Sequence, residues 1–179
     1  MSFDFRRYSR SQSGYTLVEL IVASALGLAV MTGLTSVVLT TWRASVTATS
    51  RVEASSEIRN FQLSAYEDFA RSAVPNPTGC GTQTTPCTTQ PIVLAGTQVT
   101  NSTSPTPGAL QVTYAWDGTT FLDRQAGANP ARHTSPDVTR FTWYIDTTGP
   151  NPTVVVNLTV TIQSYSESQT FRFYPRLNP

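Results

Sequence analysis

The chain has 179 residues, a length that suits one compact domain plus one long N-terminal element and is too short for two ordinary domains. Its formal net charge is +1 and 13% of its residues are charged, so composition indicates neither a basic field for nucleic acid nor an acidic disordered tail. All twelve basic residues are arginine, and Ser, Thr, Pro and Asn crowd the second half. This composition is typical of an exported, loop-rich surface.

Residues 1–14 form a short polar segment that contains Arg6, Arg7 and Arg10 and has no helical apolar pattern. Residues 17–39 are almost continuously apolar, about the length that a helix needs to cross ~30 Å of hydrocarbon. Arginines precede this run and none lies within it, which places the N-terminus on the cytoplasmic side by the positive-inside rule. We therefore expect one membrane span, with the bulk of the chain outside the cytoplasm.

Two ordinary interpretations of this N-terminus compete with a third. A secretory signal could be cut at the small residues 23–25, but that site falls early and the apolar run continues past it. A plain transmembrane anchor explains the length and the flanks, but it does not explain a carboxylate at Glu19, close to the start of the apolar run. An ionisable group there is costly, which makes Glu19 a functional candidate.

The third interpretation is a processing signal. Residues 13–23 read Ser-Gly-Tyr-Thr-Leu-Val-Glu-Leu-Ile-Val-Ala and closely resemble the N-terminal signal of type IV prepilins and secretion pseudopilins. In that family a Gly precedes the cleaved bond, a large apolar or aromatic residue becomes the methylated N-terminus, and a Glu follows one helical turn later. Gly14, Tyr15 and Glu19 match this pattern, although the aromatic is usually Phe. The resemblance covers only about the first forty residues.

The resemblance implies that a prepilin peptidase cleaves between Gly14 and Tyr15, that Tyr15 is then N-methylated, and that Glu19 is an assembly residue. In the filament the Glu19 carboxylate pairs with the Tyr15 amine of a neighbour. The implied partners are other pilins or pseudopilins through the N-terminal helix, the inner-membrane assembly platform, and membrane lipid before assembly. The implied location is the bacterial inner membrane and afterwards a periplasmic or cell-surface filament.

Small residues recur inside the apolar run, where they let helix backbones approach closely or are simply tolerated in lipid. They are Ala23, Ala25, Gly27, Ala29 and Gly33. Many major pilins have a helix-breaking Pro at the position where this chain has Ser36. Its absence, together with the sequence Ala-Leu-Gly-Leu at 25–28, resembles PilW-type minor pilins and J-type pseudopilins more than major pilins.

The expected fold is α+β and pilin-like, with one long N-terminal helix packed on an antiparallel sheet of about four to six strands. We divide the chain into a leader (1–14), a transmembrane and filament-core helix (15–41), an amphipathic helix that Pro75 ends (42–74), and a head of loop and sheet (75–179). The amphipathic part is predicted from apolar residues at helical spacing. They are Trp42, Val46, Ile58, Phe61, Ala65 and Phe69.

Residues 75–107 are rich in Thr, Pro and Gly, with one short apolar run at 92–94, and are predicted to be a connecting loop. Cys80 and Cys87 lie seven positions apart in it, which favours a local disulfide. Half of a zinc site is the alternative, but that needs further ligands. Since the only His is His133, placed in an unrelated loop, we predict no metal.

The remaining chain alternates between apolar and polar residues. A hairpin is predicted from residues 110–116 and 121–122 through the Asp117-Gly118 turn. A second set of strands is predicted from residues 138–145, 154–162 and 171–173, with a turn at 149–152. Three large aromatic residues of these strands are expected in the core. They are Trp116, Trp143 and Phe171.

Motifs for catalysis are missing: the sequence has no Gly-rich phosphate loop, no paired His ligands and no nucleophile elbow, so we predict no enzyme and no cofactor. Four aspartates are expected in or beside turns, where Asp is common for backbone reasons. They are Asp117, Asp123, Asp137 and Asp146.

The favoured function is a structural and priming subunit, a minor pilin of a type IV pilus that serves adhesion, motility or DNA uptake. The first alternative is a type II secretion pseudopilin, which shares the same helix and serves a different machine. The second is an adhesive or DNA-binding module at a filament tip. DNA is a weakly supported partner, because Arg124, Arg132 and Arg140 are only three scattered cations.

Overall fold

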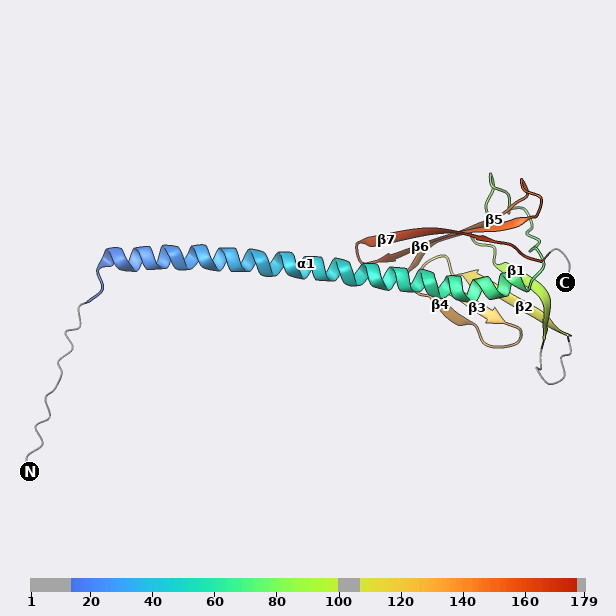
Figure 1. Ribbon diagram of the computed structural model, residues 1–179, viewed down its shortest axis with the longest axis horizontal. Coiled ribbons are helices and arrows are strands. Elements are labelled where there is room, and N and C mark those ends of the chain that lie inside the picture. Colours follow the sequence, from blue (N-terminus) through green and yellow to red (C-terminus); the bar gives the residue numbers. More distant parts are fainter. Residues whose placement is uncertain (1–13, 100–106, 177–179) are drawn as a thin grey trace, which may run out of the picture. The chain divides into compact units, whose positions relative to one another are not determined.

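The computed structural model describes residues 14–99 and 107–176. It contains one long helix, α1 (Leu17–Ala70), followed by seven strands (Figure 1). The chain divides into two compact units, residues 1–45 and residues 46–179, which we describe separately. The first unit contains the N-terminal part of α1, and the second contains the C-terminal part of α1 and all the strands.

In the first unit the described residues are exposed, and the helix is long and apolar enough to cross a membrane by length and composition. Six hydroxyl side chains in residues 17–41 donate hydrogen bonds to carbonyl oxygens three or four residues earlier, at 2.8–3.1 Å. They are Ser24, Thr32, Thr35, Ser36, Thr40 and Thr41. Each hydroxyl therefore satisfies its own donor inside the helix. The helix also continues without a break through Ser36.

The end of α1 differs from the prediction. The helix stops at Ala70 rather than at residue 74, because the following residues pair with a strand. Ser72 forms an antiparallel bridge with Gly96, and the Ala73 amide donates to the Ala95 carbonyl at 2.7 Å. A Cβ atom on Gly96 would lie 2.2 Å from the Arg71 carbonyl oxygen, so this close approach requires a glycine.

The strands form two antiparallel sheets, in which each strand pairs with the next one along the chain. The four-stranded sheet has the order β1-β2-β3-β4, and the three-stranded sheet has the order β5-β6-β7. The bounds are β1 (Ile92–Val99), β2 (Pro107–Trp116), β3 (Leu122–Ala126), β4 (Arg132–Ser135), β5 (Val138–Asp146), β6 (Thr153–Ile162) and β7 (Tyr165–Phe173). The predicted α+β, antiparallel fold is confirmed, but seven strands in two sheets replace the single sheet of four to six.

Two strands lie where the sequence indicated loop. Strand β1 lies within the predicted loop 75–107, where Ile92 and Leu94 are buried and Val93 between them is half-exposed. Strand β4 contains His133, which we had placed in a loop. Its four residues bury only Ser135, so the strand has no apolar alternation that could reveal it.

The apolar face of α1 packs on both sheets, and this face begins later than predicted. Trp42 and Val46 are 66% and 36% exposed, whereas the buried apolar residues of α1 start at Ala54. They are Ala54, Ile58, Phe61, Ala65 and Phe69. The predicted core positions from Ile58 onward are therefore confirmed, and the first two are wrong.

Phe61 joins α1 to both sheets. Its ring lies 5.7 Å from Tyr114 of β2 and 6.3 Å from Phe141 of β5, between ring centroids and edge to face in both pairs. The rings of Phe171 and Phe173 of β7 lie 5.4 and 6.3 Å away. Such aromatic pairs stabilise beyond the area that they bury.

The three aromatic residues expected in the core contribute to it. Trp143 and Phe171 are buried, and Trp116 is half-buried against the same cluster. The Trp116 indole donates to the Val138 carbonyl at 3.2 Å, so its polar atom has a partner.

An ion pair between the half-buried Arg124 and the buried Asp68 ties the end of α1 to the four-stranded sheet. Arg124 of β3 donates from Nε and Nη2 to the two carboxylate oxygens of Asp68, at 2.7 and 2.8 Å. The Tyr114 hydroxyl donates to the same carboxylate. Burial and this hydrogen bond raise the pKa of Tyr114 well above its usual range, so the hydroxyl keeps its proton. Arg124 is thus a structural residue rather than one of the scattered surface cations.

A second polar contact joins α1 to β4. The Ser135 hydroxyl donates to the Glu57 carboxylate at 3.0 Å. Burial raises the pKa of Glu57 to about 7, more than the Ser135 bond lowers it, and the nearby Asp137 and Glu53 charges add to the rise.

We predict that Asp68→Ala destabilises the head by about 2–3 kcal/mol, because it leaves the Arg124 guanidinium and the Tyr114 hydroxyl without their acceptor. Glu67→Ala is the matched control, since Glu67 is 62% exposed and its one ion pair within the described part of the chain is with the half-exposed Arg71 at 2.6 Å. Such a surface pair is worth about 0–1 kcal/mol. Urea unfolding of the detergent-solubilised full chain, followed by tryptophan fluorescence, measures both. Equal losses in the two variants would contradict the prediction.

Candidate processing and assembly site

The bond between residues 14 and 15 lies in a non-helical stretch directly before α1. Gly14 is exposed, and a Cβ atom placed on it would meet nothing within 4 Å. The Tyr15 side chain is 88% exposed. A peptidase needs an accessible backbone that can adopt an extended conformation, and the glycine leaves the bond unshielded by a side chain. The geometry therefore suits cleavage at this bond.

Thr16 and Glu19 cap the N-terminus of α1. The Glu19 amide donates to the Thr16 hydroxyl at 3.3 Å, and the Thr16 amide donates to Oε2 of Glu19 at 3.0 Å. The Thr16 hydroxyl also donates to Oε2, at 3.1 Å. This reciprocal pattern is a capping box, and the negative charge also suits the positive end of the helix dipole. The Thr-x-x-Glu spacing ahead of an apolar run could have revealed it from the sequence, but we did not use that signal.

Glu19 remains open to a second partner. Its carboxylate is exposed, and among the described residues Oε1 accepts no hydrogen bond. Tyr15, Glu19, Leu20 and Ala23 line a shallow hollow on the helix surface. Because Tyr15 and Glu19 are four residues apart and Ala23 is small, a cation from outside the chain can reach the carboxylate. The arrangement leaves Oε1 of Glu19 available as an acceptor.

A family model described as the prokaryotic N-terminal methylation motif matches residues 9–35, a range that includes Gly14, Tyr15 and Glu19. No curated protein and no solved structure gives a significant match to this chain. The motif and the α+β fold together define a type IV pilin-like protein, a structural class without enzymatic activity. The chain is therefore similar to subunits of the pilin and pseudopilin kind.

The predicted disulfide is confirmed, and the loop that contains it is docked. Cys80 and Cys87 are bonded to each other. Cys87 exchanges two backbone hydrogen bonds with Trp143 of β5, at 2.8 and 3.0 Å, and the Ile145 amide donates to the Gly81 carbonyl at 2.9 Å. The loop therefore covers the free edge of β5, which would otherwise present unpaired backbone groups.

The candidate metal and catalytic residues do not form a site. Within residues 14–99 and 107–176, no group of three or more His, Cys, Asp or Glu side chains could hold a metal ion. His133 lies beside Asp123 on neighbouring strands, and its ring centroid lies 4.4 Å from that of Phe121, with the two ring planes tilted by 32°. Asp123 is thus on β3 rather than in a turn, which corrects our expectation.

Two of the other aspartates have the expected turn roles. Asp117 accepts hydrogen bonds from the Thr119 amide and hydroxyl, at 2.8 and 2.7 Å, and these bonds lower its pKa to about 2. Asp146 accepts from the Thr148 amide at 3.0 Å in the same way. Asp137 has a φ angle of 59° between β4 and β5, a conformation that Asp tolerates better than most residues.

We predict that Cys80→Ser with Cys87→Ser increases amide hydrogen exchange in residues 76–90 and along β5, and leaves β6 and β7 protected. The reason is that the closed ring holds the strip that pairs with β5, while β6 lies between two intact strands. Mass spectrometry of peptides from the deuterated full chain measures this difference. The control is the unmutated chain, whose two cysteines should map as one disulfide without reduction. Exchange confined to residues 76–90 would show that β5 does not depend on the loop.

Proposed function

We propose that this chain is a minor pilin, a structural and priming subunit of a type IV pilus. The observation that supports this most directly is a methylation motif whose cleavable bond is exposed immediately before a membrane-length helix. In this proposal residues 1–14 are the leader, residues 15–41 cross the membrane and later form the filament core, and the rest of the chain forms the extracytoplasmic head. Prepilin peptidase and the inner-membrane assembly platform are its partners before assembly.

The proposed mechanism of assembly uses the two groups at the start of α1. Cleavage leaves an α-amine on Tyr15, which stays cationic after methylation. When helices pack side by side in a filament, the amine of one subunit pairs with the Glu19 carboxylate of the next. A buried charge pair favours one register more reliably than it adds stability, so Glu19 discourages insertion out of step. The partner-free Oε1 atom supports this role.

The runner-up is a type II secretion pseudopilin. The helix runs unbroken through Ser36, where its hydroxyl donates to the Gly33 carbonyl at 3.1 Å, and this likeness to J-type pseudopilins favours the alternative. A DNA-binding tip module has less support than the sequence indicated, because Arg124 is committed to Asp68. Neighbouring genes for a retraction ATPase or for an outer-membrane secretin would separate the two machines.

We predict that mature protein extracted from membranes begins at an N-methylated Tyr15. Mass spectrometry of the N-terminal peptide tests this directly. Replacing Gly14 with Leu should leave the precursor uncleaved in the membrane, because a bulky side chain then shields a bond that is now open. The control is Ser13→Leu, one residue further from the bond, which should be processed. An intact leader in cells with active peptidase would contradict the proposal.

We predict that Glu19→Gln is inserted and cleaved but enters sheared filaments at least about tenfold less, because it keeps a capping oxygen and loses the charge. Thr16→Ala is the matched control, since it removes the cap and keeps the carboxylate. Quantitative mass spectrometry of sheared filaments gives both yields. Equal entry of Glu19→Gln and the unmutated chain would exclude the assembly role. The same measurement should find this chain as a rare component near a tip or in a priming complex, and a dominant band would exclude the minor-subunit proposal.

A further inference from the structure

Each of the two sheets has two edge strands, and these edges are not protected equally. The β5 edge is covered by the disulfide loop, and the β1 edge pairs with residues 72–73 after α1. The β4 edge is only four residues long. Strand β7 has nine residues, and within residues 14–99 and 107–176 its backbone pairs with β6 alone. It is therefore the long edge that the described part of the chain leaves open.

The backbone groups on the open side of β7 follow from the strand register. Antiparallel neighbours exchange hydrogen bonds at every second residue. The Thr161 amide donates to the carbonyl of Asp137, just before β5, so the odd-numbered residues of β6 face β5 and the even-numbered ones face β7. These even-numbered residues pair with the odd-numbered residues of β7. The even-numbered residues of β7 thus point their amide and carbonyl groups away from β6. They are Ser166, Ser168, Thr170 and Arg172, and all are exposed.

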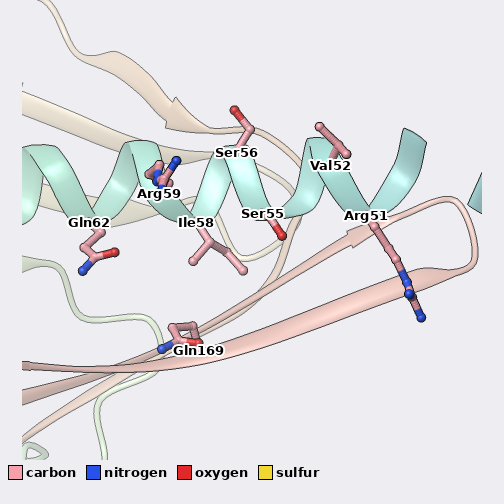
Figure 2. Close-up of a pocket in the computed structure, with 8 residues that line it drawn as sticks. All are labelled: Arg51, Val52, Ser55, Ser56, Ile58, Arg59, Gln62 and Gln169. Atoms are coloured by element: carbon pink, nitrogen blue, oxygen red, sulfur yellow. The ribbon is translucent and has the colours of Figure 1, made fainter. Parts of the chain in front are cut away.

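A groove of about 700 Å³ lies between β7 and α1 in the second unit (Figure 2). Gln169 lines it from β7, and Val52 and Arg59 are among the residues that line it from α1. On the inner face of β7, Phe171 and Phe173 are buried against the helix, whereas Gln169 is exposed. The side chains described here therefore leave space between this part of β7 and the helix.

Three large apolar side chains of α1 are exposed on the side of the helix that borders the groove. They are Val52, Leu63 and Tyr66, which are 69–70% exposed. At 100° per residue they lie within about 60° of one another around the helix axis, and Arg59 lies between them. We call the three residues the outer apolar row. Because they gather on one side of a helix whose opposite neighbours are packed, they indicate a contact surface.

We propose that β7 accepts an extended segment of a different protein subunit as an added strand. The backbone of this segment bonds to the open side of β7, and its inward side chains cover the outer apolar row. Arg59 lies within that row and has no ion pair with a described residue, so it favours a carboxylate on the added strand. The partner is a strand because an extended backbone presents donors and acceptors at the spacing of an open edge.

A second copy of this chain does not fit through its own β7 edge. Helix α1 and strand β7 run in the same direction, since Arg51 lies over Tyr165 and Phe69 stacks on Phe173. Two β7 edges paired about a two-fold axis would point their helices in opposite directions, whereas copies anchored in one membrane point the same way. We therefore take the strand from another subunit of the same filament, which agrees with a minor component. In this respect the inference rests on the proposed function.

The test places a photo-crosslinking amino acid in turn at Ser166, Ser168 and Thr170 of the full-length chain, in cells that express the complete filament system. After irradiation, mass spectrometry maps the cross-linked residues. We expect the three positions to reach one segment of another subunit, with the cross-linked residue moving by about two residues at each step in a constant direction. The proposal is wrong if the cross-linked residue does not move in register, if only copies of this chain are joined, or if no cross-link forms.

A proline in the edge tests the backbone pairing itself. Ser168→Pro should reduce the cross-link from Thr170 about tenfold, because it removes an open donor at a place where an edge strand tolerates proline. Ser168→Ala is the matched control, since it keeps the amide and loses the same hydroxyl contact with Thr159, at 2.9 Å. Equal yields from the two variants would show that the partner does not pair with the β7 backbone.

A change on α1 tests the outer apolar row and decides the question even if Ser168→Pro does not fold. Leu63→Glu should reduce the cross-link at least about fivefold, because it places a charge where the added strand packs. Val93→Glu makes the same kind of change on the half-exposed Val93 of β1 and should leave the cross-link unchanged. An undiminished cross-link in Leu63→Glu would contradict the proposal. Cleavage at Gly14 and entry into filaments are measured separately, so the strand pairing can fail while the proposed function stands.

Discussion

The position of Phe61 is the constraint on which the head depends. One face of α1 must serve two sheets, and the Phe61 ring touches β2 on one side and β5 and β7 on the other. Two turns later on the same helix, Asp68 holds Arg124 of β3 by a bidentate ion pair. Apolar packing around Phe61 thus joins α1 to both sheets. The ion pair between Asp68 and Arg124 then sets how α1 is placed on the four-stranded sheet.

Local patterns predicted the parts of the head whose residues alternate clearly. The strands β5 and β6 follow from period-two apolar residues, the β2–β3 hairpin follows from Asp117 and Gly118, and the disulfide follows from the spacing of Cys80 and Cys87. Strand β4 could not be predicted in this way, because it buries one residue in four. Strand β1 was hidden by its polar second half and by the Thr- and Pro-rich context before it.

Other features depended on contacts between distant residues. Nothing local distinguishes Arg124, which pairs with Asp68, from Arg132 and Arg140, which are exposed on the surface. The same is true of the division into two sheets, since the β4–β5 connection is short and could equally have continued one sheet. More of the candidate site could be predicted from the sequence, because Gly14, Tyr15 and Glu19 belong to one contiguous motif. The sequence analysis missed only the capping role of Glu19. The carboxylate caps its own helix through Thr16, in addition to the pairing that we propose with the Tyr15 amine of a neighbouring subunit.

The hydroxyl groups in the apolar half of α1 affect how easily this helix can leave a lipid bilayer. Each of the six is bonded to a carbonyl of its own helix, so the segment presents no unsatisfied hydroxyl donor to its surroundings. Such a helix can move from the hydrocarbon of a bilayer into a protein interior without breaking or forming hydroxyl hydrogen bonds along its length. The free-energy difference between the two environments is then concentrated at the N-terminal charges, where a single ion pair can decide it.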